Sequence, residues 1–161
     1  MTTHFIFSIT KQDRLSIEKI LRSTDFFNEE EILVALELVD EKLKLKDKST
    51  YQFILAKNEN DICTGYSCYG KVPGTDSSFD LYWIAVHQDF RNHQIGKALL
   101  NETEKQVIKQ KGLRLYAETS GRKQYHPTHE FYWRNHFKLE ARLTDYYSKG
   151  DDKLIFVSCL S

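Results

Sequence analysis

Two repeating patterns of apolar residues divide this chain into helices and strands. A spacing of three to four residues, typical of an amphipathic helix, occurs over residues 11–21 and again after Asn28, Ile95 and Pro127. Asn28 is a good N-cap, and a glutamate three residues later completes a capping box. Pro127 fits the first turn of the last helix, which we expect to end near residues 135–136.

Runs rich in β-branched and aromatic residues predict about seven strands. We place them at residues 4–10, 51–57, 62–69, 79–86, 113–119, 137–147 and 153–160. The element order is therefore β-α-α-β-β-β-α-β-α-β-β. It predicts an α+β fold, three-layer α/β/α-like, with a mixed central sheet of about seven strands and four helices. The strand–helix–strand passage over residues 79–119 predicts one parallel step within that sheet.

Length and composition narrow the classes of protein. The 161 residues contain no repeat or long linker, so we expect a single domain, 1–161. Lys plus Arg equals Asp plus Glu at 23 each, which argues against a nucleic-acid partner that needs a strong positive field. No apolar run is long enough for a bilayer, and we expect no membrane partner. Three cysteines, an odd count, favour reduced thiols and a cytoplasmic location.

The most informative stretch, Arg91 to Leu100, joins the strand ending at Val86 to the helix beginning at Ile95. The first N–H groups of a helix have no intrahelical partner, and the helix dipole adds positive charge there. Gly96 removes a Cβ where a ligand could approach the backbone. The stretch lacks both the P-loop and the dinucleotide-binding pattern. By itself it is explained equally well by an anion site and by an ordinary connection.

Two motifs give this stretch a wider context. Ile84-Ala85-Val86, followed by Arg91-x-x-Gln94-x-Gly96-x-Ala98-Leu99-Leu100, resembles the acetyl-CoA-binding core of the GNAT N-acetyltransferase superfamily. Thr128-x-x-Phe131-Tyr132-x-x-Asn135-His136-Phe137 resembles that superfamily's second signature. With the element order, the resemblance covers essentially the whole chain. Asn92, Gln94 and His136 stand where the superfamily usually has glycine. Asn and His tolerate the left-handed conformation, so a cap at His136 is still expected.

The resemblance implies a cofactor and a reaction. It implies acetyl-CoA as cosubstrate and direct acetyl transfer to a primary amine, either of a small molecule or of a peptide N-terminus or lysine. It also implies a monomer or homodimer. The implied cofactor contacts are Ile84, Ala85, Val86, Arg91, Asn92, His93, Gln94, Ile95, Gly96, Lys97 and Ala98. The spacing His126-x-x-His129-Glu130 hints at a metal, but no third ligand follows, and we expect no metal.

Acetyl transfer to an amine needs a base, an oxyanion donor and an acid. The resemblance implies Tyr132 as the acid that protonates the departing thiolate. It favours Glu118, at the end of its strand, as the base, with Asp80 as a weaker candidate. The Val86 N–H is the implied oxyanion donor. Tyr146 and Tyr147 either line an acceptor pocket or only pack.

The same residues also fit roles without catalysis. A glutamate at a strand end is usually a solvated side chain, and a tyrosine beside a phenylalanine is usually part of a core. The chain could therefore be a non-catalytic acyl-CoA-binding or sensing module that keeps the loop without turnover.

Overall fold

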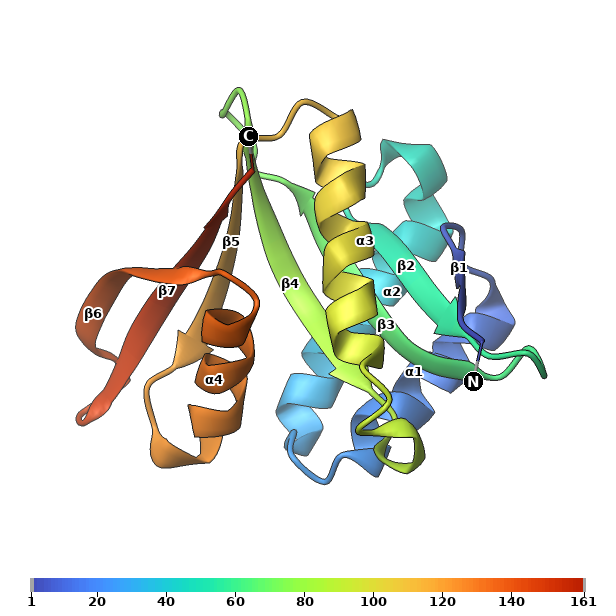
Figure 1. The fold of residues 1–161 in the computed structure, drawn as a ribbon, viewed down its shortest axis with the longest axis horizontal. Helices are drawn as coiled ribbons and strands as arrows, with labels where there is room; N and C mark the ends of the chain where they lie inside the picture. Colours follow the sequence, from blue (N-terminus) through green and yellow to red (C-terminus); the bar gives the residue numbers. More distant parts are fainter. Residues whose placement is uncertain (1, 161) are drawn as a thin grey trace. The chain divides into compact units, whose positions relative to one another are not determined.

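The computed structural model describes residues 2–160, which contain four α-helices and seven strands (Figure 1). The helices are α1 Lys11–Ser23, α2 Glu29–Leu45, α3 Ile95–Lys109 and α4 His126–Arg134. The strands are β1 His4–Ile6, β2 Gln52–Lys57, β3 Cys63–Lys71, β4 Ser78–Val86, β5 Arg114–Ser120, β6 Lys138–Ser148 and β7 Asp151–Cys159. Short 3-10 turns lie at η1 Lys46–Lys48, η2 Gln88–Phe90 and η3 Lys123–Tyr125. The predicted order of elements and the α+β class are confirmed.

The chain forms two compact units. The first runs up to Gly70 and resumes over Trp83–Lys105, and the second consists of Lys71–Tyr82 and everything from Gln106 onward. Strand β4 and helix α3 therefore each have residues in both units.

In the first unit, β1, β2 and β3 form an antiparallel set. Figure 1 shows α3 on the near side of these strands, with α1 and α2 on the far side. The far helices bury their apolar faces, among them Ile17 and Leu21 of α1 and Leu36 and Val39 of α2. The predicted capping box of α2 is present, because Asn28 accepts from the Glu31 N–H at 2.8 Å and the Glu31 carboxylate accepts from the Asn28 N–H.

In the second unit, the first half of β4 runs parallel to β5 over Ser78–Leu81 and Arg114–Ala117. Strand β7 pairs antiparallel with both β5 and β6. The predicted parallel step is therefore confirmed. Parallel neighbours need a long crossover, and α3 supplies it.

The first strand is shorter than predicted. It ends at Ile6, whereas the pattern predicted residues 4–10. Thr10 instead caps α1, because its side chain accepts from the Asp13 N–H while the Asp13 carboxylate accepts from the Thr10 N–H at 2.8 Å. The capping box competes with the strand for Thr10, and the helix gains satisfied N–H groups from it.

Helix α4 ends as the sequence predicted. His136 has φ 70°, the left-handed conformation expected of a residue in the usual glycine position. The Phe137 N–H donates to the Tyr132 carbonyl at 3.0 Å and the His136 N–H to the Trp133 carbonyl at 3.2 Å. This pair of bonds is the Schellman arrangement that closes a helix.

The turn after α3 requires a residue without a side chain. A Cβ on Gly112 would lie 2.3 Å from Val107 Cγ1 and 2.8 Å from the Phe79 ring. Val107 and Phe79 are both buried in the core, so neither can move away cheaply.

We predict that Gly112→Ala lowers the free energy of unfolding by about 2 kcal/mol, because it overpacks this core. Urea denaturation measures the change. Gly121→Ala is the matched control, since its added Cβ would meet only ordinary contacts of 3.5 Å or more. Equal losses in the two variants would contradict the assignment of the effect to packing.

Candidate functional site

Close packing around Gly65 fixes the end of β4 and the start of α3. A Cβ on Gly65 would lie 2.9 Å from the Ala85 carbonyl oxygen and 3.0 Å from Leu99 Cδ1. The Ala85 carbonyl of β4 and the Leu99 side chain of α3 therefore both lie against Gly65, where a side chain would have no room. Ala85, one of the residues expected at the cofactor, sits in this contact.

Polar contacts tie β3 to α3 and to the segment that follows β4. The Ser67 and Thr103 hydroxyls lie 2.8 Å apart with no exposed surface, and Thr103 Oγ1 donates to the Leu99 carbonyl. The His87 N–H donates to the Thr64 carbonyl at 2.8 Å, which pins the chain where it leaves β4. The Gln88 N–H donates to Ser23 Oγ at 3.0 Å and ties the following turn to α1.

The loop from Arg91 to Gln94 enters α3 through two left-handed residues. Asn92 has φ 65° and Gln94 has φ 59°. These are two of the three positions at which glycine was expected from the family pattern, and the backbone has kept the conformation that glycine favours. Left-handed residues within a turn point successive N–H groups into an anion-binding concavity.

Helix α3 presents its N-terminus to this loop. The Ala98 N–H donates to the Gln94 carbonyl at 3.0 Å, so the first turn leaves the N–H groups of Ile95, Gly96 and Lys97 without an intrahelical acceptor. The N–H of Ala98 is thus bonded within the helix. The exposed side chains of Arg91 and Lys97 add positive charge.

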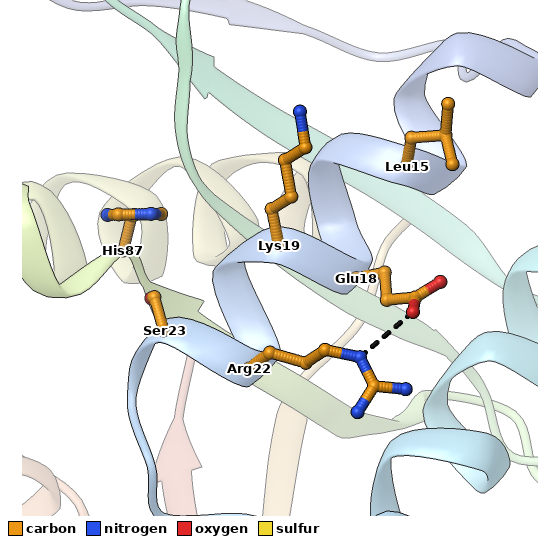
Figure 2. Close-up of a pocket in the computed structure, with 6 residues that line it drawn as sticks. All are labelled: Leu15, Glu18, Lys19, Arg22, Ser23 and His87. Atoms are coloured by element: carbon orange, nitrogen blue, oxygen red, sulfur yellow. Dashed lines mark hydrogen bonds and ion pairs between the residues drawn. The ribbon is translucent and has the colours of Figure 1, made fainter.

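A shallow pocket of about 490 Å³ lies in the same unit, along α1 and beside the residue that follows β4 (Figure 2). Its lining residues are Leu15, Glu18, Lys19, Arg22, Ser23 and His87. Arg22 is held by Glu18 at 2.9 Å and by Glu29 at 2.7 Å. In Figure 2 the Lys19 side chain projects away from the paired Glu18 and Arg22.

Tyr132 lies in an aromatic cluster of the second unit. Only 5% of the residue is exposed, and its ring packs against Phe131, Phe137 and Phe156. Burial raises the pKa of its phenol well above the ordinary value of 10, so the hydroxyl keeps its proton at neutral pH.

His129 anchors the helix that carries Tyr132. Its Nε2 lies 2.8 Å from the Ser120 carbonyl, and its ring packs on Phe156. The histidine therefore ties α4 to the end of β5. Within residues 2–160, no group of three or more His, Cys, Asp or Glu side chains is arranged to hold a metal ion.

Two carboxylates and one lysine share a face of the second unit's strands. Asp80 is the register partner of Tyr116, two residues before Glu118, and alternate residues of a strand point to the same side. Lys153 Nζ lies 2.8 Å from Glu118 Oε2, and its side chain is only 12% exposed. The pKa of Asp80 is raised, first by burial and then by the Glu118 charge, against the opposing effect of Lys153.

The end of β6 covers this lysine with an aromatic ring. The Tyr146 ring centroid lies 4.3 Å from Lys153 Nζ, within cation–π range, and Tyr146 contacts Tyr147 edge to face at 5.1 Å. The ladder between β6 and β7 is irregular between Leu143 and Ser148, and Asp145 has φ 54°. Tyr146 lies within this irregular stretch, and a β-bulge is a feature that changes the direction of nearby side chains.

The comparisons with known proteins identify the family. A family profile for the acetyltransferase (GNAT) domain matches residues 49–139. A solved structure from Desulfovibrio desulfuricans, assigned to the GNAT family of acetyltransferases, is 41% identical over 99% of this chain and 100% of its own, with a TM-score of 0.95. The chain therefore belongs to the GNAT family of acetyltransferases, and it is an N-acetyltransferase by class.

More distant structures share the fold. An aminoglycoside 6'-acetyltransferase type Ii is 20% identical over 100% of this chain and 98% of its own, with a TM-score of 0.79. The yncA protein of Salmonella typhimurium, solved with acetyl-CoA, is 16% identical over 100% and 95%, with a TM-score of 0.74. No curated protein matches the chain.

The site residues expected from the sequence fall into two groups. The expected cofactor residues, Ile84–Val86 and Arg91–Ala98, belong to the first unit, and Glu118 and Tyr132 belong to the second. Lys153 was missed. It lies 35 positions along the chain from Glu118, and only the antiparallel register of β5 and β7 brings the two together. The single sequence signal was its position within a strand beside a charged turn.

Gln94 offers a direct test of the loop. We predict that Gln94→Gly raises the free energy of unfolding by about 1 kcal/mol, because a left-handed non-glycine residue costs more than the added chain entropy of glycine. The melting temperature measures the gain. His93→Gly is the matched control and should lower stability, since no left-handed φ occurs at His93. If Gln94→Gly lowered the melting temperature as much as His93→Gly, the inferred backbone strain at Gln94 would be contradicted.

The raised pKa of Asp80 predicts a pH-dependent change in stability. A raised pKa in the folded state means that folding is favoured while Asp80 is protonated, and that this contribution is lost as the pH rises through the folded pKa. Asp80→Asn should therefore gain stability relative to wild type between about pH 3.5 and pH 7. Denaturation at both pH values tests this, with the exposed Asp76→Asn as the control for charge removal. If the difference in stability between Asp80→Asn and wild type were the same at both pH values, the expectation would be refuted.

Proposed function

We propose that this protein transfers the acetyl group of acetyl-CoA directly to a primary amine, that the whole chain 1–161 acts as one catalytic domain, and that it works in the cytoplasm as a monomer or homodimer. The observation that carries the cofactor assignment is the loop before α3, where Asn92 and Gln94 adopt the left-handed backbone in place of glycine. Left-handed residues directly before a helix start turn N–H groups toward a common point, where an anion can bind, and this supports the assignment.

In this proposal the pyrophosphate of acetyl-CoA binds the loop and the first turn of α3. The N–H groups of Ile95, Gly96 and Lys97 donate to the phosphate oxygens, and Arg91 and Lys97 add charge. The remaining loop residues, His93 among them, shape the concavity. The pantetheine arm pairs with Ile84, Ala85 and Val86 like an added strand, and the Val86 N–H receives the oxyanion.

An ammonium has no lone pair, so a base must take its proton before attack. Glu118 is our first candidate, because it is half exposed and bonds to Lys153, the ammonium on which the exposed Tyr146 packs. Asp80 is a second candidate, supported by its raised pKa, since a carboxylate with a raised pKa is the stronger base. The two neighbouring carboxylates therefore differ in their environments.

Tyr132 is the proposed proton donor to the departing thiolate. Its buried phenol stays protonated at working pH, which a donor must do. The same burial makes it a weaker acid than a phenol in water. It therefore acts as a hydrogen-bond donor that gives up its proton only as the thiolate forms.

The second candidate function is a non-catalytic acyl-CoA-binding module. One observation favours it, namely that Glu118 already accepts a hydrogen bond from Lys153 at 2.8 Å. A carboxylate that is already bonded to an internal ammonium is occupied and is not open to the amine of an acceptor.

We predict saturable binding of acetyl-CoA and release of free thiol in the presence of an amine. The panel should include amino acids, polyamines, aminoglycosides and peptides with free N-termini. Calorimetry measures the binding and a thiol reagent measures turnover. Binding without turnover across the panel would exclude the enzyme and establish the second candidate.

Three single variants test the proposed proton transfers. Tyr132→Phe should lower kcat by about tenfold to a hundredfold and leave acetyl-CoA affinity unchanged, because it removes only the hydroxyl. Glu118→Gln and Asp80→Asn distinguish the bases, since the variant of the true base should lose about a hundredfold or more in kcat. An unchanged rate for Tyr132→Phe, where chemistry limits the rate, would contradict the acid role. The surface change Glu140→Gln serves as the control.

A further inference from the structure

Lys153 presents its own amine to the proposed base. Its Nζ donates to Glu118 Oε2 at 2.8 Å, which lies within the range required for proton transfer from an amine to a general base. The Tyr146 ring lies against the same ammonium at 4.3 Å. An ammonium that contacts both a carboxylate and an aromatic face is in the arrangement by which proteins bind an amine ligand.

The surroundings show that Lys153 occupies this place stably. Its side chain is 12% exposed, although lysine is almost always exposed in folded proteins. Burial alone would lower the pKa of Lys153, but the contacts with Glu118 and Tyr146 together outweigh it and the pKa is raised. The irregular stretch between Leu143 and Ser148, with Asp145 left-handed, accompanies the position of Tyr146 over the ammonium. Tyr146 is itself 54% exposed, so Lys153 lies just beneath the surface.

We propose that Lys153 is a site of self-acetylation, the internal amine that the protein acetylates when no acceptor is present. The inference rests on the proposed function, because it uses acetyl-CoA as the donor and Glu118 as the base. It goes beyond that function by assigning a modified residue within the same chain.

The step balances in atoms and charge. Glu118 takes one proton from the Lys153 ammonium, and the freed Nζ attacks the thioester carbonyl of acetyl-CoA. The C–S bond breaks as the C–N bond forms, and the CoA thiolate leaves and is protonated. The nitrogen loses its second proton through Glu118 to solvent, so the products are Nζ-acetyl-lysine, CoA with a free thiol, and one proton.

Acetylation changes the face on which it occurs. An acetylated Nζ is neutral, so it loses both the ion pair with Glu118 and the cation–π contact with Tyr146. Glu118 is then left without its cationic partner at Lys153. In the acetylated protein Glu118 can therefore bind the amine of an external acceptor, whereas in the unmodified protein Glu118 is bonded to Lys153.

The experiment incubates the full chain with acetyl-CoA and no acceptor, and follows the mass of the intact protein and of its peptides. We expect one acetyl group per chain, on Lys153 and not on the exposed Lys149 of the neighbouring turn, with one equivalent of free thiol. The rate constant should not depend on protein concentration, because the reaction is intramolecular. Modification with a rate constant proportional to protein concentration, or spread over exposed lysines, would overturn the proposal.

Base catalysis and simple chemical acetylation predict opposite changes in the rate of Lys153 acetylation when Glu118 is replaced. If Glu118 is the base, Glu118→Gln should slow acetylation of Lys153 by about a hundredfold. If Lys153 merely reacts with acetyl-CoA in solution, the same change should speed it, because loss of the carboxylate frees the amine, and the proposal would be wrong. Lys153→Arg keeps a cation at Glu118 and should take up no acetyl group, whereas Lys149→Arg should behave as wild type.

A parallel assay with the amine panel distinguishes the two proposals. Turnover of an external amine with Lys153 unmodified would overturn the self-acetylation and leave the proposed function standing. Absence of acetyl-CoA binding would remove the proposed function and the self-acetylation together. Acetylation of Lys153 alone, with no external turnover, would support the inference and restrict the proposed function to the chain itself.

Discussion

The parallel pairing of β4 with β5 is the constraint on which the rest of the structure depends. Parallel neighbours cannot be joined by a tight turn, so the chain must travel the length of the strand and return, which it does through α3. This crossover places a helix N-terminus shortly after the end of β4. The position of the proposed anion site is therefore a consequence of the strand direction, and the left-handed residues Asn92 and Gln94 lie directly before this helix start.

Close contacts keep that crossover rigid where the ligand is expected. Gly65 allows β4 and α3 to approach β3, and the buried Ser67–Thr103 hydroxyl pair fixes the helix along its axis. A helix that slid by one residue would turn its first N–H groups away from the loop by about 100°. Packing on one side of α3 thus determines the direction of the N–H groups at its first turn.

The strands of the second unit carry a cluster of three charged side chains. Asp80, Glu118 and Lys153 lie on one face, where the Glu118 charge contributes to the raised pKa of Asp80 and Lys153 opposes the rise. Two carboxylates in unequal environments are suited to different tasks. The lysine contributes to that inequality, since it is bonded to Glu118.

The sequence by itself determined the order of elements, the parallel step, the capping box of α2 and the left-handed end of α4 at His136, because these follow from local periodicity and local hydrogen bonds. It also placed the loop at the start of α3, from a motif that resembles the family. It overextended the first strand, since Thr10 could serve either a strand or a cap. Only the tertiary structure decided that Lys153 meets Glu118, that Tyr146 covers the lysine, and that His129 ties α4 to Ser120. These contacts depend on the register between strands distant in the chain, and register is fixed by packing over whole strands, which no local pattern records.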